Sequence, residues 1–357
     1  ENRLKYTIPF GTYFGIPVRI HLTFPLILIV FGAEAWLRAG WLEAFWAVLL
    51  VACVFVCVVL HEFGHSLQVR RYGIRVKDII LLPIGGMARA ESIPEKPIQE
   101  IIVAISGPLV NFALALIFFI IIWLRRSSFD FENEFLGSLL WINLVLGVFN
   151  LTPAFPMDGG RILRAFFAMR LPYLKATRYA KNIGQLIAGL FVIVGFRNPR
   201  FIMLPVIAVF IFFGAISEER IVRVKVALKG RRSRDFLRRN VPMLRASETV
   251  EAVVGVIGTD DSAAWAVTDD TGEFIGAVVR QDLFAAIERG NSHEPVATYA
   301  RSEFPRVDAE MPAIQTYYLM RADKIPLVGV VADGRYEGLV FFEDMAAAVA
   351  EFGRSAT

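Results

Sequence analysis

The sequence predicts a polytopic α-helical membrane domain of about six transmembrane helices, followed by a soluble α/β domain. Hydrophobic residues make up 55% of the 357 residues, and the mean hydropathy is +0.52, above that of an ordinary soluble domain. Long uncharged runs end near residue 216, and short apolar stretches alternate with charged residues beyond it. We therefore expect a membrane domain at 1–217, a basic juxtamembrane linker at 218–240 and a soluble domain at 241–357.

Each expected span is an apolar segment with few charged residues. The six segments cover residues 22–36, 41–60, 98–124, 135–154, 183–196 and 201–216. A helix needs about 20 residues to cross a bilayer. The second, third and fourth segments meet that length, whereas the first, fifth and sixth are short.

The distribution of Lys and Arg predicts the orientation of these spans. With six spans, most basic residues of the connecting segments fall on one side of the membrane, together with both chain ends. Loops rich in Lys and Arg stay in the cytoplasm, so we expect a multi-pass protein of the cell membrane with both termini cytoplasmic. The basic run 220–239 directly follows the last span. Attraction to anionic lipid headgroups explains it more simply than nucleic-acid binding, and no nucleic-acid partner is expected.

The run His61-Glu62-Phe63-Gly64-His65 directly follows the charge-free stretch 44–60. Two His four residues apart project from one face of a helix, where both can bind one metal ion. A Glu beside the first His is the usual base for water activated by that metal. Ionisable groups inside a span are costly and mark functional sites. The alternative is a pair of His packed at a helix end.

A third metal ligand is expected from another segment, because a catalytic zinc usually has three protein ligands and keeps one position for water. Asp158, at the end of the fourth apolar segment, is the best candidate, since it lies on the same predicted side as His65. Two prolines precede Asp158 and two glycines follow it, which suits a bent segment with close backbone approach. Alternatively, Asp158 caps the following helix. Spacing alone leaves both open.

The H-E-x-x-H pattern on the second apolar segment and N-x-x-P-x-x-P-x-D-G on the fourth resemble the site-2 protease family of intramembrane zinc metalloproteases. Residues 106–111 on the third segment are similar as well. The resemblance implies that His61, His65 and Asp158 bind zinc. It also implies that Glu62 is the catalytic base for hydrolysis of a peptide bond.

The same resemblance implies a substrate-binding role for three further residues. Asn150 is similar to a family Asn near the scissile bond, although packing between helices explains it equally well. Gly85 and Gly86 lie in the apolar segment 79–90, which we expect to form a hairpin that pairs with an extended substrate. An ordinary surface hairpin is the alternative.

The family resemblance also implies partners. The substrate is expected to be a membrane-anchored protein, cut within or near the cytoplasmic side of the bilayer, and an inhibitory membrane partner is possible in this family. The spans are not separated by a PDZ-like insertion, and a soluble tail follows them instead. This arrangement resembles the sporulation-type branch of the family. Two competing hypotheses are an inactive membrane scaffold and a nucleotide-regulated transporter. Stoichiometric zinc in the purified protein distinguishes the protease from the transporter.

The tail contains the same pattern twice, a helix, two strands and a second helix. The first round places helices at 247–257 and 282–288 around strands at 263–268 and 274–279. The second places helices at 311–320 and 344–352 around strands at 325–331 and 338–342. This resembles a tandem pair of CBS domains.

CBS pairs imply a homodimer and, in many cases, an adenine nucleotide bound through an Asp and a Ser or Thr. Asp282 and Asp344 match the family Asp residues, but Val279 and Phe341 occupy the hydroxyl positions. Asp282 and Asp344 are alternatively helix caps. We therefore expect a dimerisation or substrate-docking role ahead of nucleotide binding.

Overall fold

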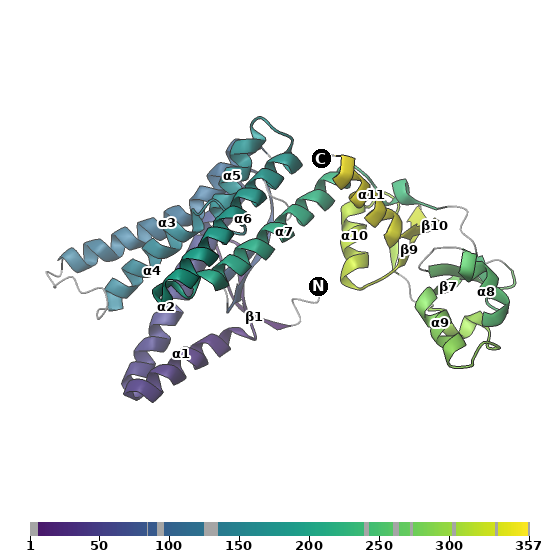
Figure 1. Cartoon of the computed structure of the whole chain (residues 1–357), viewed down its shortest axis with the longest axis horizontal. Coiled ribbons are helices and arrows are strands. Elements are labelled where there is room, and N and C mark those ends of the chain that lie inside the picture. Colours follow the sequence, from purple (N-terminus) through teal and green to yellow (C-terminus); the bar gives the residue numbers. More distant parts are fainter. Residues whose placement is uncertain are drawn as a thin grey trace. The chain divides into compact units, whose positions relative to one another are not determined.

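A computed structural model describes residues 6–83, 85–90, 96–124, 135–238, 243–259, 264–271, 274–301, 305–332 and 335–355. The chain divides into two compact units, Glu1–Glu219 and Arg220–Thr357. Figure 1 shows that the first unit is mainly helical and that the second combines strands and helices.

Among its described residues, the first unit contains six α-helices and the larger part of a seventh, which continues into the second unit. They are α1 (Phe24–Ala39), α2 (Trp41–Arg71), α3 (Pro97–Leu124), α4 (Phe135–Asn150), α5 (Asp158–Ala168), α6 (Tyr173–Arg197) and α7 (Leu204–Ala227), with a short 3-10 helix, η2 (Pro199–Phe201), before α7. Each of the six predicted apolar segments lies mostly in one of these helices. The fourth segment extends beyond its helix, because α4 ends at Asn150. The additional helix is α5, which begins at Asp158.

Three of these helices are candidate membrane spans. Within the described residues, α2, α3 and α6 are long and apolar enough to cross a bilayer, and α4 is a shorter apolar helix. Helix α1 is 16 residues long and carries Glu34 and Arg38, paired at 2.6 Å. The charged residues of α7 all lie in its second half, from Glu218 to Lys225. Helices therefore occupy all six segments, while the number of six spans stays a prediction.

A four-stranded sheet lies against α2. Its strands are β1 (Thr7–Tyr13), β2 (Ile16–His21), β3 (Val76–Leu82) and β4 (Gly85–Ala90), in the spatial order β1-β2-β3-β4. Strands β3 and β4 form the antiparallel hairpin predicted at 79–90, and β2 pairs with β3 in parallel. Buried Ile16, Val18 and Ile79 pack with Phe55 and Phe63 of α2. This packing places β4 at the edge of the sheet, next to α2.

A buried ion network joins α3, α5 and α7. The side chain of Arg164 on α5 is 1% exposed. Its Nε donates to Oε1 of Glu100 on α3 at 2.8 Å, and its Nη1 donates to Oε1 of Glu218 on α7 at 2.6 Å. The guanidinium also lies over the rings of Phe155 and Tyr173, about 5 Å from each centroid. The network fixes α5, and hence Asp158 at its start, against α3.

Replacing Arg164 by Met is expected to destabilise the first unit by about 3–5 kcal/mol, because Glu100 is left as an unpaired buried carboxylate. Thermal unfolding in detergent measures the effect. The double variant Arg164→Met/Glu100→Gln should regain part of the loss. The matched control is Arg38→Met, which breaks an exposed pair worth less than about 1 kcal/mol. Equal stability of the two single variants would contradict the role of the network.

The second unit consists of two repeats of the same topology. The first repeat contains β5 (Met243–Arg245), α8 (Val250–Thr259), β6 (Ala264–Thr268), β7 (Phe274–Val279) and α9 (Arg280–Glu288). The second contains β8 (Arg306–Asp308), α10 (Ala313–Ala322), β9 (Leu327–Ala332), β10 (Arg335–Phe341) and α11 (Phe342–Ser355), and a 3-10 helix, η4 (Val296–Tyr299), precedes β8. Each three-stranded sheet has one parallel and one antiparallel pairing. The repeated pattern predicted for the tail is confirmed.

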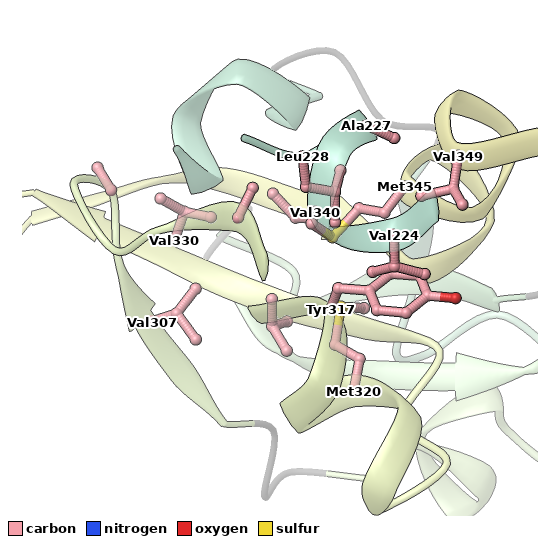
Figure 2. Close-up of a cluster of buried hydrophobic side chains, with 13 residues drawn as sticks. Val224, Ala227, Leu228, Val307, Tyr317, Met320, Val330, Val340, Met345 and Val349 are labelled. Atoms are coloured by element: carbon pink, nitrogen blue, oxygen red, sulfur yellow. The ribbon is translucent and has the colours of Figure 1, made fainter. Parts of the chain in front are cut away.

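The segment expected to be a basic linker is instead part of the second unit. Val224, Ala227 and Leu228 at the end of α7 are buried against the second repeat, among Val340, Met345 and Val349, as Figure 2 shows. After α7, the 3-10 helix η3 (Ser233–Phe236) follows, and Ser233 is fully buried.

The basic side chains of this segment also pair within the second unit. Arg232 and Arg234 contact Glu310, and Arg238 contacts Asp344. These residues therefore belong to the second unit, and the juxtamembrane position of 218–240 stays a prediction. Val224 and Leu228 are four residues apart, so they lie on the same helix face and can be buried together. A count of charges does not reveal this apolar face.

Candidate metal centre and active site

Helix α2 carries both His residues of the H-E-x-x-H pattern without interruption. It continues from Trp41 to Arg71, so His61 and His65 lie one turn apart on the same face. Both are buried, at 6% and 7% exposed. The two Nε2 atoms lie 3.1 Å apart.

Asp158 meets this pair from α5. Its Oδ2 lies 3.0 Å from Nε2 of His65 and 3.3 Å from Nε2 of His61. Met157 holds the N-cap position of α5 and Asp158 is its first residue, so the structure does not use Asp158 as the cap. Among the described residues, these three form the group whose ligand atoms converge closely enough for a metal ion.

The three ligand atoms fit a zinc ion. A tetrahedral zinc with bonds of about 2.0–2.1 Å has its ligand atoms about 3.3 Å apart. The separations of 3.0, 3.1 and 3.3 Å match that edge length. Two imidazole nitrogens and one carboxylate oxygen form a donor set that zinc hydrolases use, and three protein ligands leave one position for water.

Hydrogen bonds on the far side of each ring hold the imidazoles in the metal-binding tautomer. Nδ1 of His61 donates to Oδ1 of Asn111 at 2.5 Å, and Nδ1 of His65 donates to the carbonyl oxygen of Val103 at 2.7 Å. With Nδ1 protonated, each Nε2 keeps a free lone pair. Asn111 is itself held, because its Nδ2 donates to Oδ1 of Asn143 on α4 at 2.9 Å.

Replacing Asn111 by Ala is expected to lower zinc affinity about 10–100-fold, because the His61 ring loses its orienting partner. Zinc competition with a chromophoric chelator measures the change. Asn150→Ala is the control, since the Nδ2 of Asn150 donates to the Leu146 carbonyl of its own helix at 3.0 Å. Unchanged affinity in the Asn111 variant would show that the tautomer is held without it.

Glycines let the elements of the centre approach each other. A Cβ built on Gly107 of α3 lies 2.2 Å from Nε2 of His65 and 2.7 Å from Nε2 of His61. A Cβ on Gly64 lies 2.6 Å from the carbonyl oxygen of Ser106. At the start of α5, a Cβ on Gly159 lies 2.2 Å from the carbonyl oxygens of Leu151 and Thr152. No side chain fits at these positions.

Glu62 faces the edge strand β4. Its Oε2 accepts a hydrogen bond from the backbone N–H of Ala88 at 3.3 Å. Gly86 is packed against the same side chain, since a Cβ there would lie 2.6 Å from Cγ of Glu62. Glu62 and His65 also line a cavity of about 450 Å³ together with residues of β4 and with Arg161. Water therefore has space beside the three candidate metal ligands.

The other predicted site residues have local contacts of their own. Gly85 has a φ of +137° and open space at its Cβ position. Asn150 is half-buried at the end of α4 and bonds back to its own helix. In the second unit, Asp282 pairs with Arg301 at 2.9 Å, and Asp344 pairs with Arg238 through Nε at 2.7 Å.

Four residues at the centre have roles that sequence reasoning did not assign. Asn111 orients His61, Gly107 makes room for both imidazoles, and Ser66 and Arg161 line the cavity. An Asn within an apolar run is a sequence signal for a polar contact between helices. Gly107 lies within the family-like stretch 106–111, but that likeness does not give its role, because its neighbours come from another helix.

The fold and the site define a metal-dependent hydrolase built on apolar helices, and comparison with known proteins assigns its family. Residues 49–131 and 129–194 match the model for peptidase family M50, and residues 234–289 match that for the CBS domain. The chain is 33% identical to the zinc metalloprotease MJ0392 of Methanocaldococcus jannaschii, covering 96% of each chain. It is 28% identical to a putative zinc metalloprotease of Synechocystis, covering 78% of each.

A solved structure, the site-2 protease from Methanocaldococcus jannaschii, is 39% identical and covers 60% of this chain and 95% of its own, with a TM-score of 0.46. The chain therefore belongs to peptidase family M50, the site-2 proteases. It is a zinc metalloprotease with a CBS domain in its second unit.

Proposed function

We propose that this protein is an intramembrane endopeptidase that hydrolyses peptide bonds of membrane-anchored proteins, within or near the cytoplasmic side of the bilayer. The observation that carries the proposal is the convergence of His61, His65 and Asp158 beside Glu62 at the end of the apolar part of α2. Membrane location is supported by the family and by α2, where only 17% of the apolar window is buried within the protein.

His61, His65 and Asp158 would hold one zinc ion, and Glu62 would act as the general base. Zinc supplies Lewis acidity that makes water more acidic and polarises a peptide carbonyl. The carboxylate of Glu62 takes a proton from the attacking water and returns it to the leaving amine. Asn111 and the Val103 carbonyl keep the imidazoles oriented throughout.

The edge of β4 is the proposed docking site for substrate backbone. A peptide bond in a helix is shielded by its own hydrogen bonds, so the substrate must become extended before cleavage. An extended segment can add to an exposed sheet edge. Ala88 presents its N–H toward Glu62, and Gly86 allows close approach to the same residue. Gly85 and Asn150 are proposed as further substrate contacts on family resemblance.

The basic loops support a multi-pass protein with both termini in the cytoplasm. For the second unit we propose a docking or dimerisation role. We also propose, on family resemblance, that an inhibitory membrane protein binds this protease. Binding of an adenine nucleotide at Asp282 and Asp344 is the less favoured alternative. Each of these carboxylates already pairs with an arginine, and Phe341, at a hydroxyl position, is 1% exposed.

Purified protein is expected to contain one zinc per chain, and zinc removal by a chelator should abolish cleavage of a single-span membrane peptide. Adding zinc back should restore cleavage. The variant Asp158→Ala should bind zinc at least about 10-fold more weakly. A folded protein without zinc, or cleavage that survives zinc removal, would overturn the proposed function.

A further inference from the structure

The cavity beside Glu62 and His65 has a polar wall made by residues outside the metal-binding group. Ser66 of α2 and Arg161 of α5 form part of this wall, and Lys77 of β3 and Arg89 of β4 line it as well. Its volume of about 450 Å³ is enough for an amino-acid side chain.

Two buried polar atoms on this wall have no hydrogen-bond partner within the part of the chain that the structure describes. They are Oγ of Ser66, a residue that is 1% exposed, and Nε of Arg161. Buried polar atoms are nearly always satisfied, so each exception requires an explanation. Both residues line the same cavity, and a ligand that accepts hydrogen bonds is one way to satisfy these two donors.

The residues that line the cavity include three basic side chains, Lys77, Arg89 and Arg161, and one acidic side chain, Glu62. Arg89 is neutralised by Asp78, to which its Nε donates at 2.6 Å. Nη1 of Arg161 lies 3.6 Å from Oδ1 of Asp158, too far for a hydrogen bond. Lys77 and Arg161 then stand against the one lining carboxylate, Glu62, and this excess of positive charge favours an anionic ligand.

The cavity is also placed to receive a substrate side chain. Ala88, Arg89 and Ala90 of the edge strand line it. Alternate side chains of a segment added to β4 point to the same face. A residue close to the scissile bond would thus direct its side chain between β4 and Arg161.

We propose that this cavity is a specificity subsite for an acidic substrate side chain, Asp or Glu, adjacent to the cleaved bond. Its carboxylate accepts hydrogen bonds from Arg161 and Ser66, and Lys77 adds attraction at the rim. This inference rests on the proposed endopeptidase function and names the substrate feature that the site selects.

The test uses the zinc-loaded full-length protein in detergent and a series of single-span peptides. One Asp is moved through the positions flanking the cleaved bond, and each peptide is paired with one that has Asn there. At one position, Asp is expected to raise kcat/KM about 10–100-fold over Asn, the range for hydrogen bonds to a charged group. Dissociation constants for zinc-loaded Glu62→Gln should show the same preference without turnover.

Arg161→Gln and Ser66→Ala are expected to reduce the Asp/Asn ratio, and Lys77→Gln to reduce it less. Zinc content is measured in each variant, because Arg161 lies near Asp158. If wild type cleaves both peptides of every pair equally, the subsite is overturned while the protease function stands. If Arg161→Gln slows both peptides equally, Arg161 acts on the backbone or on Asp158, and the subsite is again overturned. If no peptide is cleaved, equal dissociation constants overturn the subsite, and the missing cleavage counts separately against the proposed function.

Discussion

Replacing Glu62 by Gln will lower peptide cleavage by about 10²–10⁴-fold, the contribution of a positioned general base. The amide of Gln has nearly the same shape as the carboxylate but cannot accept the proton of the attacking water. Zinc should remain at the wild-type stoichiometry, because His61, His65 and Asp158 are unchanged. Turnover of a membrane peptide and zinc content are measured on the same preparation.

The matched control for this prediction is Glu43→Gln. Glu43 lies in the first turn of the same helix and is exposed, so its loss should leave both cleavage and zinc content unchanged. Undiminished cleavage in the Glu62 variant would contradict the role of Glu62 as base. Loss of zinc together with cleavage would show that Glu62 supports the metal-binding group instead.

The variant Gly107→Ala is expected to lose zinc, with an affinity at least about 100-fold below wild type. The new Cβ would lie 2.2 Å from Nε2 of His65, so the imidazole must leave its position or α3 must move away from α2. The second movement is resisted, because α2 and α3 are already in close backbone contact at Gly64 and Ser106. Chelator competition measures the affinity, and circular dichroism checks that the helices persist.

Gly189→Ala is the control for this substitution. Gly189 lies in the candidate span α6, and no atom lies within 4 Å of its Cβ position. Alanine favours a helix over glycine by about 1 kcal/mol, so this variant should bind zinc as wild type does. Full zinc affinity in the Gly107 variant would show that the imidazoles lie farther from α3 than the structure places them.

Long uninterrupted patterns in the sequence were sufficient to predict most elements. The apolar runs 41–60 and 98–124 cover most of α2 and α3, and the tail contains the same pattern twice. Such long signals are the ones that a sequence pattern predicts best. Strands β1 and β2 were not predicted. Strand β2 pairs in parallel with β3, a strand that follows α1 and α2 in the chain. A pairing between distant segments leaves little local signal.

The basic run after residue 219 is a second case in which the sequence pattern did not predict the packing. Its charges indicated a linker at the membrane surface, but Val224 and Leu228 are buried in the second repeat. Burial depends on which surface meets that helix face, and this is decided by tertiary packing.

For the site, the sequence by itself determined the chemistry. His61 and His65 share a helix face whenever residues 61–65 are helical, and Glu62 accompanies them. Only the tertiary structure decided which third ligand and which surrounding residues join them. Packing of α5 against α3 brings Oδ2 of Asp158 within 3.3 Å of both Nε2 atoms. The space beside Gly107 and the wall of Ser66 and Arg161 likewise arise where separate elements meet, and a linear pattern cannot encode distances across such contacts.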